Sequence, residues 1–69
     1  MTNNKVRGYR VMLGLTQKQL SEKLGCSNQS VSSKEKGKTP FNDKEKTIIL
    51  NLVKEIHPTA TIDELFFEQ

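Results

Sequence analysis

The segment that most constrains the fold of this 69-residue chain is the stretch of residues 16–37. It contains two short runs in which apolar residues recur at helical spacing, and the sequence Leu24-Gly25-Cys26-Ser27 separates them. A tight turn between two crossing helices needs a residue in the left-handed backbone conformation, which Gly25 can adopt. Such helices also need a small residue where their backbones approach each other, and Ser21 meets this need. The pattern therefore predicts two helices that cross near a right angle.

Apolar residues and helix caps on both sides of the turn support this interpretation. The residues that would lock the corner fall in register: Leu20, Leu24, Cys26 and Val31. The first helix begins with a capping box of Thr16 and Gln19, and Gly25 ends it after about nine residues. The second helix begins after the N-cap Ser27 and ends before Gly37. This arrangement is typical of a helix-turn-helix motif.

A longer amphipathic helix is predicted after this motif. It begins at Asn42 or Asp43, both of which are good N-caps. It ends at His57-Pro58, because the residue before a proline is disfavoured in a helix. One arc of the helix carries its apolar residues: Ile48, Ile49, Leu52, Val53 and Ile56.

The two ends of the chain supply the remaining helices. A first helix follows an N-cap at Asn3 or Asn4 and ends at Gly14. A short last helix follows the N-cap Thr61. Its contribution to the core comes from Ile62, Leu65 and one of Phe66 and Phe67. No segment has the pattern of a strand, so we expect an all-α, compact five-helix bundle that forms a single domain over residues 1–69.

Composition excludes several classes of protein. Cys26 is the only cysteine and His57 the only histidine, so neither an intramolecular disulfide nor a Cys/His metal cluster can form. These two residues also cannot supply the nucleophile, base and orienting group of covalent catalysis. An apolar run such as Ile48-Ile49-Leu50 is far shorter than the ~20 residues of a membrane span, and the first residues lack a signal-peptide pattern. We therefore expect a cytoplasmic protein that is not an enzyme and needs no metal or cofactor.

Charge is unevenly distributed along the chain. Residues 1–38 contain eight basic and two acidic residues, a net charge of +6, whereas residues 39–69 carry a net charge of −3. A basic half beside an acidic half indicates a surface that meets a polyanion. Lysine-rich soluble proteins without such a partner also show some imbalance of charge. The charge distribution alone therefore does not decide whether this chain binds a polyanion.

Landmarks across about residues 5–67 resemble the phage repressor and Cro class of helix-turn-helix regulators, the XRE-like family. The sequence Leu13-Gly14-Leu15-Thr16-Gln17 is similar to the start of the family's second helix, and Glu35-Lys36-Gly37-Lys38 is similar to the end of its third. Ile62-Asp63-Glu64-Leu65-Phe66 resembles the C-terminal helix of many members. The resemblance implies a lambda-repressor-like fold with its helix-turn-helix at about residues 16–36.

The resemblance also assigns roles to single residues and shows two departures. Arg10 and Glu35 stand where family members often place an internal ion pair between the first and third helices, and such a pair would orient the reading helix. Lys34 stands where the family usually has an apolar or aromatic residue, so we expect its stem to pack while its ammonium group reaches solvent. Lys36 replaces the usual asparagine.

The helix at about residues 27–36 carries short polar side chains that suit DNA bases. With Val31 directed inward, Gln29, Ser33 and Lys36 point outward at about 100° per residue. Amides can bridge N6 and N7 of adenine, and hydroxyls can donate or accept. The predicted base-reading residues are Asn28, Gln29, Ser32 and Ser33. A solvated helix face without this function would have a similar composition.

Phosphate contacts call for different chemistry, namely donors at helix N-termini and nearby cations. The residues that fit are Gln17, Ser27, Ser30, Lys36 and Lys38. For any one of these lysines, solubility is the alternative role.

The leading hypothesis is a sequence-specific regulator of transcription that binds double-stranded DNA and is of the small phage or mobile-element type, such as a repressor. The family resemblance implies a homodimer on a palindromic operator, with half-sites ~34 Å apart. The candidate dimer contacts are Leu50, Phe66 and Phe67. The alternative is a protein-interaction module on the same scaffold, either antitoxin-like or able to bind an antirepressor.

Overall fold

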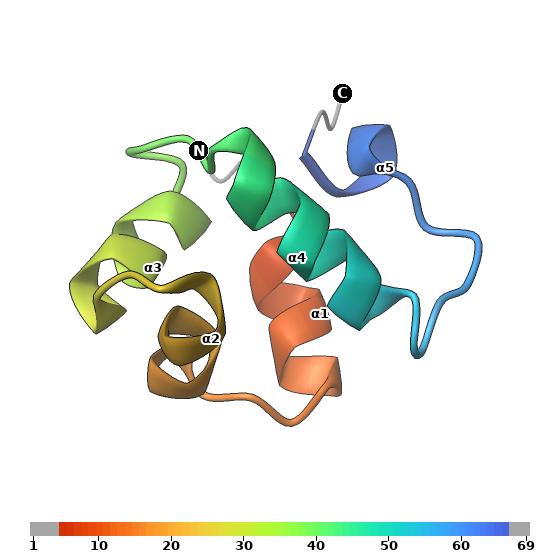
Figure 1. Ribbon diagram of the computed structural model, residues 1–69, viewed down its shortest axis with the longest axis horizontal. Coiled ribbons are helices and arrows are strands. Elements are labelled where there is room, and N and C mark those ends of the chain that lie inside the picture. Colours follow the sequence, from red (N-terminus) through yellow and green to blue (C-terminus); the bar gives the residue numbers. More distant parts are fainter. Residues whose placement is uncertain (1–4, 67–69) are drawn as a thin grey trace.

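The computed structural model describes residues 5–66, and they form five helices. The helices are α1 (Val6–Met12), α2 (Gln17–Leu24), α3 (Asn28–Glu35), α4 (Asp43–Val53) and α5 (Ile62–Phe66). No strand occurs within the described range. In Figure 1, α4 runs through the centre and packs on α1, with α2 and α3 on one side and α5 on the other. The prediction of an all-α five-helix bundle is confirmed.

The caps and the turn of the motif follow the sequence prediction. The Gln19 amide donates to Thr16 Oγ1 at 3.0 Å, and the Thr16 amide donates to Gln19 Oε1 at 2.9 Å. Ser27 caps α3 by accepting from the Ser30 amide at 3.1 Å. Gly25 has φ 77°, the left-handed conformation that the turn between α2 and α3 requires.

The other helix starts resolve one open choice, confirm one predicted cap and leave a second choice outside the described residues. Asn42, rather than Asp43, is the N-cap of α4, and its side chain accepts from the Glu45 amide at 2.8 Å. Thr61 Oγ1 accepts from the Glu64 amide at 3.1 Å, as predicted for α5. Lys5 holds the N-cap position of α1 without a side-chain hydrogen bond. The predicted caps Asn3 and Asn4 lie outside the described residues, as does Phe67.

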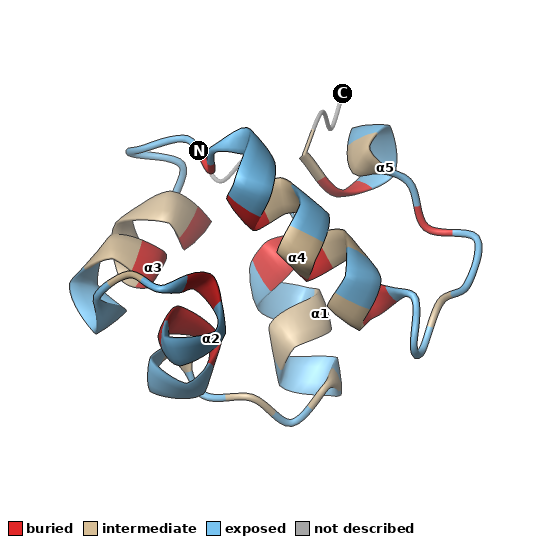
Figure 2. Ribbon diagram, in the orientation of Figure 1, coloured by how far each residue is buried: buried red, intermediate tan, exposed pale blue. Residues whose placement is uncertain are grey.

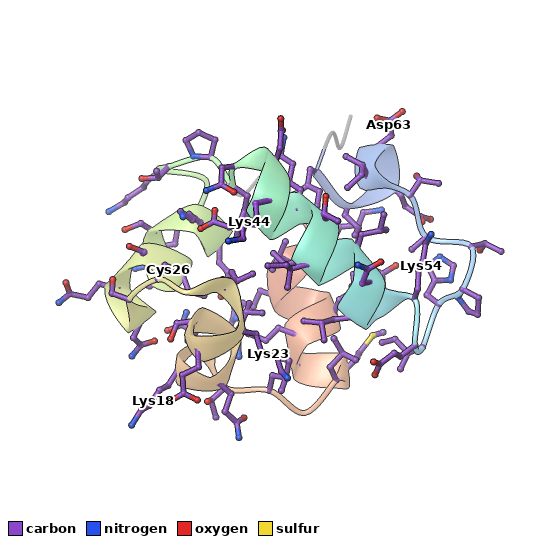
Figure 3. All side chains as sticks on the ribbon, in the orientation of Figure 1. Lys18, Lys23, Cys26, Lys44, Lys54 and Asp63 are labelled. Carbon is purple, nitrogen blue, oxygen red and sulfur yellow. The ribbon has the colours of Figure 1, made fainter. Side chains whose placement is uncertain are left out.

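Apolar residues from all five helices and two connecting segments form the core. They are Val6, Leu20, Leu24, Val31, Phe41, Ile49, Val53, Ala60 and Leu65. Figure 2 shows these buried segments turned toward the centre of the bundle, while the N-terminal turn of α3 is exposed. Cys26, in the turn between α2 and α3 (Figure 3), is half-buried and packs against this core, in line with its predicted role at an apolar corner. Ile62, which was also expected to complete the core, is only half-buried.

The predicted end of α4 is wrong, and one predicted core residue is wrong with it. The helix ends at Val53 instead of continuing to His57. The amides of Ile56 and His57 both donate to the Val53 carbonyl, at 3.0 and 2.8 Å, so the chain closes a turn and leaves the helix axis. Ile56 therefore departs from the apolar arc and is 44% exposed.

Candidate nucleic-acid interface

The outer surface of α3 carries the four predicted base-reading residues. Val31 is fully buried, which fixes the opposite side of the helix as the outer one. Asn28 and Gln29 are exposed, and Ser32 and Ser33 are half-buried. The structure therefore presents amides and hydroxyls at the surface of α3.

These four residues divide between two neighbouring faces of α3. Asn28 and Ser32 line a groove between α3 and the start of α2. Gln29 and Ser33 line a smaller depression on the other side, together with the hydroxyl-bearing residues Ser27 and Ser30. The sequence predicted which residues face outward, but it did not predict this division.

The groove between α2 and α3 has a volume of about 800 Å³ and is rich in basic groups. Arg7, Lys18 and Lys36 line it and are exposed. Figure 3 shows Lys18 extending from α2 away from the body of the molecule. Arg7 and Lys18 were not among the predicted contacts, although both contribute to the positive charge of residues 1–38 that the sequence reveals.

Gln17 lines this groove at the start of α2. It is half-buried, and its side-chain Nε2 donates to Glu35 Oε1 at 3.1 Å. The amide is thereby held beside the exposed end of α2, where helix N–H groups and the helix dipole favour an anion. The sequence predicted a phosphate contact at Gln17 but did not predict its bond to Glu35.

Arg10 and Glu35 form a buried ion pair between α1 and α3. Arg10 Nε lies 2.6 Å from Glu35 Oε2, and Nη2 lies 3.3 Å from Oε1. A third nitrogen, Nη1, donates to the Leu15 carbonyl at 2.8 Å. The side chains of Arg10 and Glu35 are only 11% and 3% exposed. With Gln17 as a further donor, Glu35 joins α1, α2 and α3 at one point.

Lys34 is the clearest departure from the sequence prediction. Its ammonium group turns to a carboxylate instead of extending into solvent: Nζ donates to both carboxylate oxygens of Glu45, at 2.8 and 2.7 Å. The side chains of Lys34 and Glu45 are 13% and 5% exposed. Because a buried carboxylate lies within reach, pairing with it replaces hydration of the ammonium group, and the lysine stem packs as expected.

The charge of Glu45 is maintained by its neighbours. Burial by itself would raise the pKa of its carboxyl group, but the hydrogen bonds from Lys34 and from the Asn42 amide, together with the lysine charge, lower that pKa below its ordinary value. Glu45 Oε1 accepts from the Asn42 amide at 3.0 Å, which completes the capping box of α4. In the described part of the chain, every buried side-chain nitrogen or oxygen has a hydrogen-bond partner.

The remaining predicted phosphate contacts lie at the two ends of α3. Ser27 Oγ lies 3.0 Å from Ser30 Oγ at the start of the helix. Lys36 and Lys38 are exposed at its end. The polar groups and cations are thus distributed along the whole length of α3.

The candidate dimer contacts are less open than the groove. Leu50 and Phe66 are half-buried and pack against the core. Phe66 meets Phe41 edge-on, with ring centroids 5.5 Å apart.

Residues 5–66 contain no cluster of three or more potential metal-ligating side chains and no helix long and apolar enough to cross a membrane.

Comparison with known proteins places the chain in a family. A family model described as helix-turn-helix matches residues 6–45, which include α1, α2, α3 and the start of α4 and make up more than half of the chain. No curated protein and no solved structure matches the chain. The matched residues include the capped turn, the Arg10–Glu35 pair and the polar outer surface of α3. The chain therefore belongs to the helix-turn-helix family, the XRE-type class of DNA-binding transcription regulators.

Proposed function

We propose that this chain is a sequence-specific regulator of the small phage or mobile-element type, which inserts α3 into the major groove of double-stranded DNA. The observation that carries the proposal is the outer surface of α3, where Gln29 and Ser33 lie opposite the buried Val31 and Asn28 and Ser32 lie on the neighbouring face. An α-helix fits the major groove, where each base pair shows a distinct set of donors and acceptors. Asn28 and Gln29 suit adenine N6 and N7, and the two serines suit either donors or acceptors.

Phosphate contacts position α3 in the groove. The donors are at the N-terminus of α2 and along α3: Gln17, Ser27, Ser30, Lys36 and Lys38. Arg7 and Lys18 join them, because they line the same groove as Gln17. Each neutralised phosphate releases condensed counterions, so affinity falls with salt by ~0.9 log unit per contact for each log unit of salt.

The functional unit is a homodimer on a palindromic operator, acting as a repressor. Two copies related by a two-fold axis place their α3 helices in successive major grooves ~34 Å apart. Leu50, Phe66 and Phe67 are the proposed dimer contacts. Leu50 and Phe66 are only half-buried, which supports this assignment.

Selection of bound sequences from a pool of random duplexes, at two salt concentrations, tests the proposal. We expect a short palindromic consensus that persists at the higher salt concentration. The double variant Gln29→Ala/Ser33→Ala should lose the consensus, since a good bidentate base contact contributes about 1–3 kcal/mol of discrimination. Asn51→Ala, which removes an exposed amide from α4, is the matched control and should retain it. Absence of any enriched sequence with the unmodified chain would contradict the proposal.

A further inference from the structure

The attachment of α3 to the rest of the bundle is unusual for a helix that must be aimed accurately. Among its eight described residues, only Val31 and Glu35 are buried, so a single valine supplies the fully buried apolar contact. One apolar anchor restricts the distance of a helix from the core but leaves its rotation about its own axis weakly fixed. Other contacts must therefore fix that rotation.

Two ion pairs from adjacent residues hold the last turn of α3 to two different helices. Glu35 is tied to Arg10 on α1, and Lys34 is tied to Glu45 on α4. Adjacent residues of a helix project about 100° apart, so the two pairs act in different directions. With Val31 placed between them, the two pairs hold α3 at both margins of its inner face, so a rotation of the helix in either direction would disturb one of them.

The Lys34–Glu45 pair is rigid on its α4 side. Glu45 belongs to a capping box with Asn42, so its position is fixed by the start of α4. The Lys34 ammonium group also lies 6.0 Å from the centroid of the buried Phe41 ring, within reach of a cation–π contact. On the α3 side, Lys34 lines the same depression as Gln29 and Ser33.

We propose that Lys34 and Glu45 are positioning residues for DNA recognition, whose buried ion pair fixes the rotation of α3 and thereby aims Gln29 and Ser33 at the bases. This inference rests on the proposed function. Lys34 then contacts no phosphate, although it is a lysine on the reading helix. Lys34 contributes to the selectivity of the chain among duplexes. It does not change the number of phosphates that the chain neutralises.

The test compares Lys34→Met, Lys36→Ala and the unmodified chain on a selected duplex and on a scrambled one, over a range of salt concentrations. Lys34→Met keeps an unbranched stem and removes the charge. We expect it to lower the ratio of the two affinities about tenfold, within the coupling range of contacting residues, and to leave the salt slope unchanged. Lys36→Ala, the matched control, should lower the slope by about 0.9 and retain the ratio.

Glu45→Gln separates positioning from simple electrostatics. Glutamine can keep the capping box, as Gln19 does in α2, and the variant gains one unit of positive charge. General attraction to DNA predicts tighter binding, whereas the positioning role predicts lower selectivity despite the added charge. The losses in Lys34→Met and Glu45→Gln should not add in the double variant, because both break the same pair. Lys34→Arg, which keeps the charge, should restore selectivity.

The outcomes separate this inference from the proposed function. If the unmodified chain does not distinguish the two duplexes, the proposed function fails. If it does, and folded Lys34→Met retains the ratio or lowers the salt slope, only the positioning role is overturned. Circular dichroism establishes that each variant is folded at the temperature of measurement. Should Lys34→Met fail to fold, Glu45→Gln decides the question alone: retained selectivity overturns the inference and reduced selectivity supports it.

Discussion

The helices α3 and α4 follow each other in the chain, but different forces hold them in the bundle. α4 buries Ile49 and Val53 and follows a regular apolar arc. α3 buries one apolar residue and is also attached by two ion pairs and by the hydrogen bond from Gln17 to Glu35. Apolar contacts are non-directional, whereas ion pairs and hydrogen bonds depend on geometry. The comparison indicates that apolar burial holds α4 in place, whereas polar attachments set the orientation of α3.

Among the variants that test this comparison, Arg10→Ala is expected to have the largest effect on stability and on DNA binding. Arg10→Ala leaves the Glu35 carboxylate buried with only the Gln17 amide as a remaining side-chain donor. Breaking a buried pair in this way should lower the free energy of unfolding by about 3–5 kcal/mol, and DNA binding should be lost with it. Urea denaturation measures the change.

Arg7→Ala is the matched control, because Arg7 is an exposed arginine on the same helix. Its free energy of unfolding should change by about 0.5 kcal/mol or less. Equal stability of Arg10→Ala and Arg7→Ala would show that the Arg10–Glu35 pair does not hold α3.

A smaller change in α4 sharpens the contrast. Ile49→Val removes one buried methylene-sized group and should lower the free energy of unfolding by about 0.5–1.5 kcal/mol. The ratio of affinities for a selected and a scrambled duplex should stay the same, since Ile49 does not orient α3. A fall in that ratio comparable to that of Lys34→Met would erase the distinction between the two helices.

The smallest expected effect is a pH dependence that originates at Glu45. Its pKa is lowered in the folded state, so the stabilisation is complete above the unfolded-state pKa and is lost as pH falls through the folded-state value. The unmodified chain should therefore lose more stability on acidification than Glu45→Gln. Denaturation at neutral pH and at a series of acidic pH values gives the comparison. Parallel pH profiles of the two proteins would contradict it.

The sequence predicts the corner between α2 and α3 well, because the signals there are local. Thr16 with Gln19, and Ser27 with Ser30, form caps over three residues, and Gly25 marks the turn. These contacts depend on residues that are close in the chain, so the spacing alone specifies them. The apolar residues of the corner follow the helical period for the same reason.

The partners of charged residues are less predictable, because they depend on where distant segments meet. Lys34 and Glu45 belong to different helices, and no periodic pattern links them. Phe41 and Ala60 lie in connecting segments, where helical periodicity does not report burial.

The early end of α4 also escaped prediction. Pro58 marks where a helix must have ended, but the chain already closes a turn on the Val53 carbonyl before it reaches that proline. In the candidate site, the outward residues of α3 were predictable, whereas the groove with Arg7 and Lys18 required the relative placement of three helices.

The most direct test of the central claim is a titration of the 15N-labelled protein with its selected duplex, followed by the backbone amide signals in NMR spectra. The claim is that the outer surface of α3 and the start of α2 meet DNA. We expect the largest shifts at residues 17–18 and 28–36, with small shifts in α5. Largest shifts in α4 and α5, with unchanged signals in α3, would contradict the account.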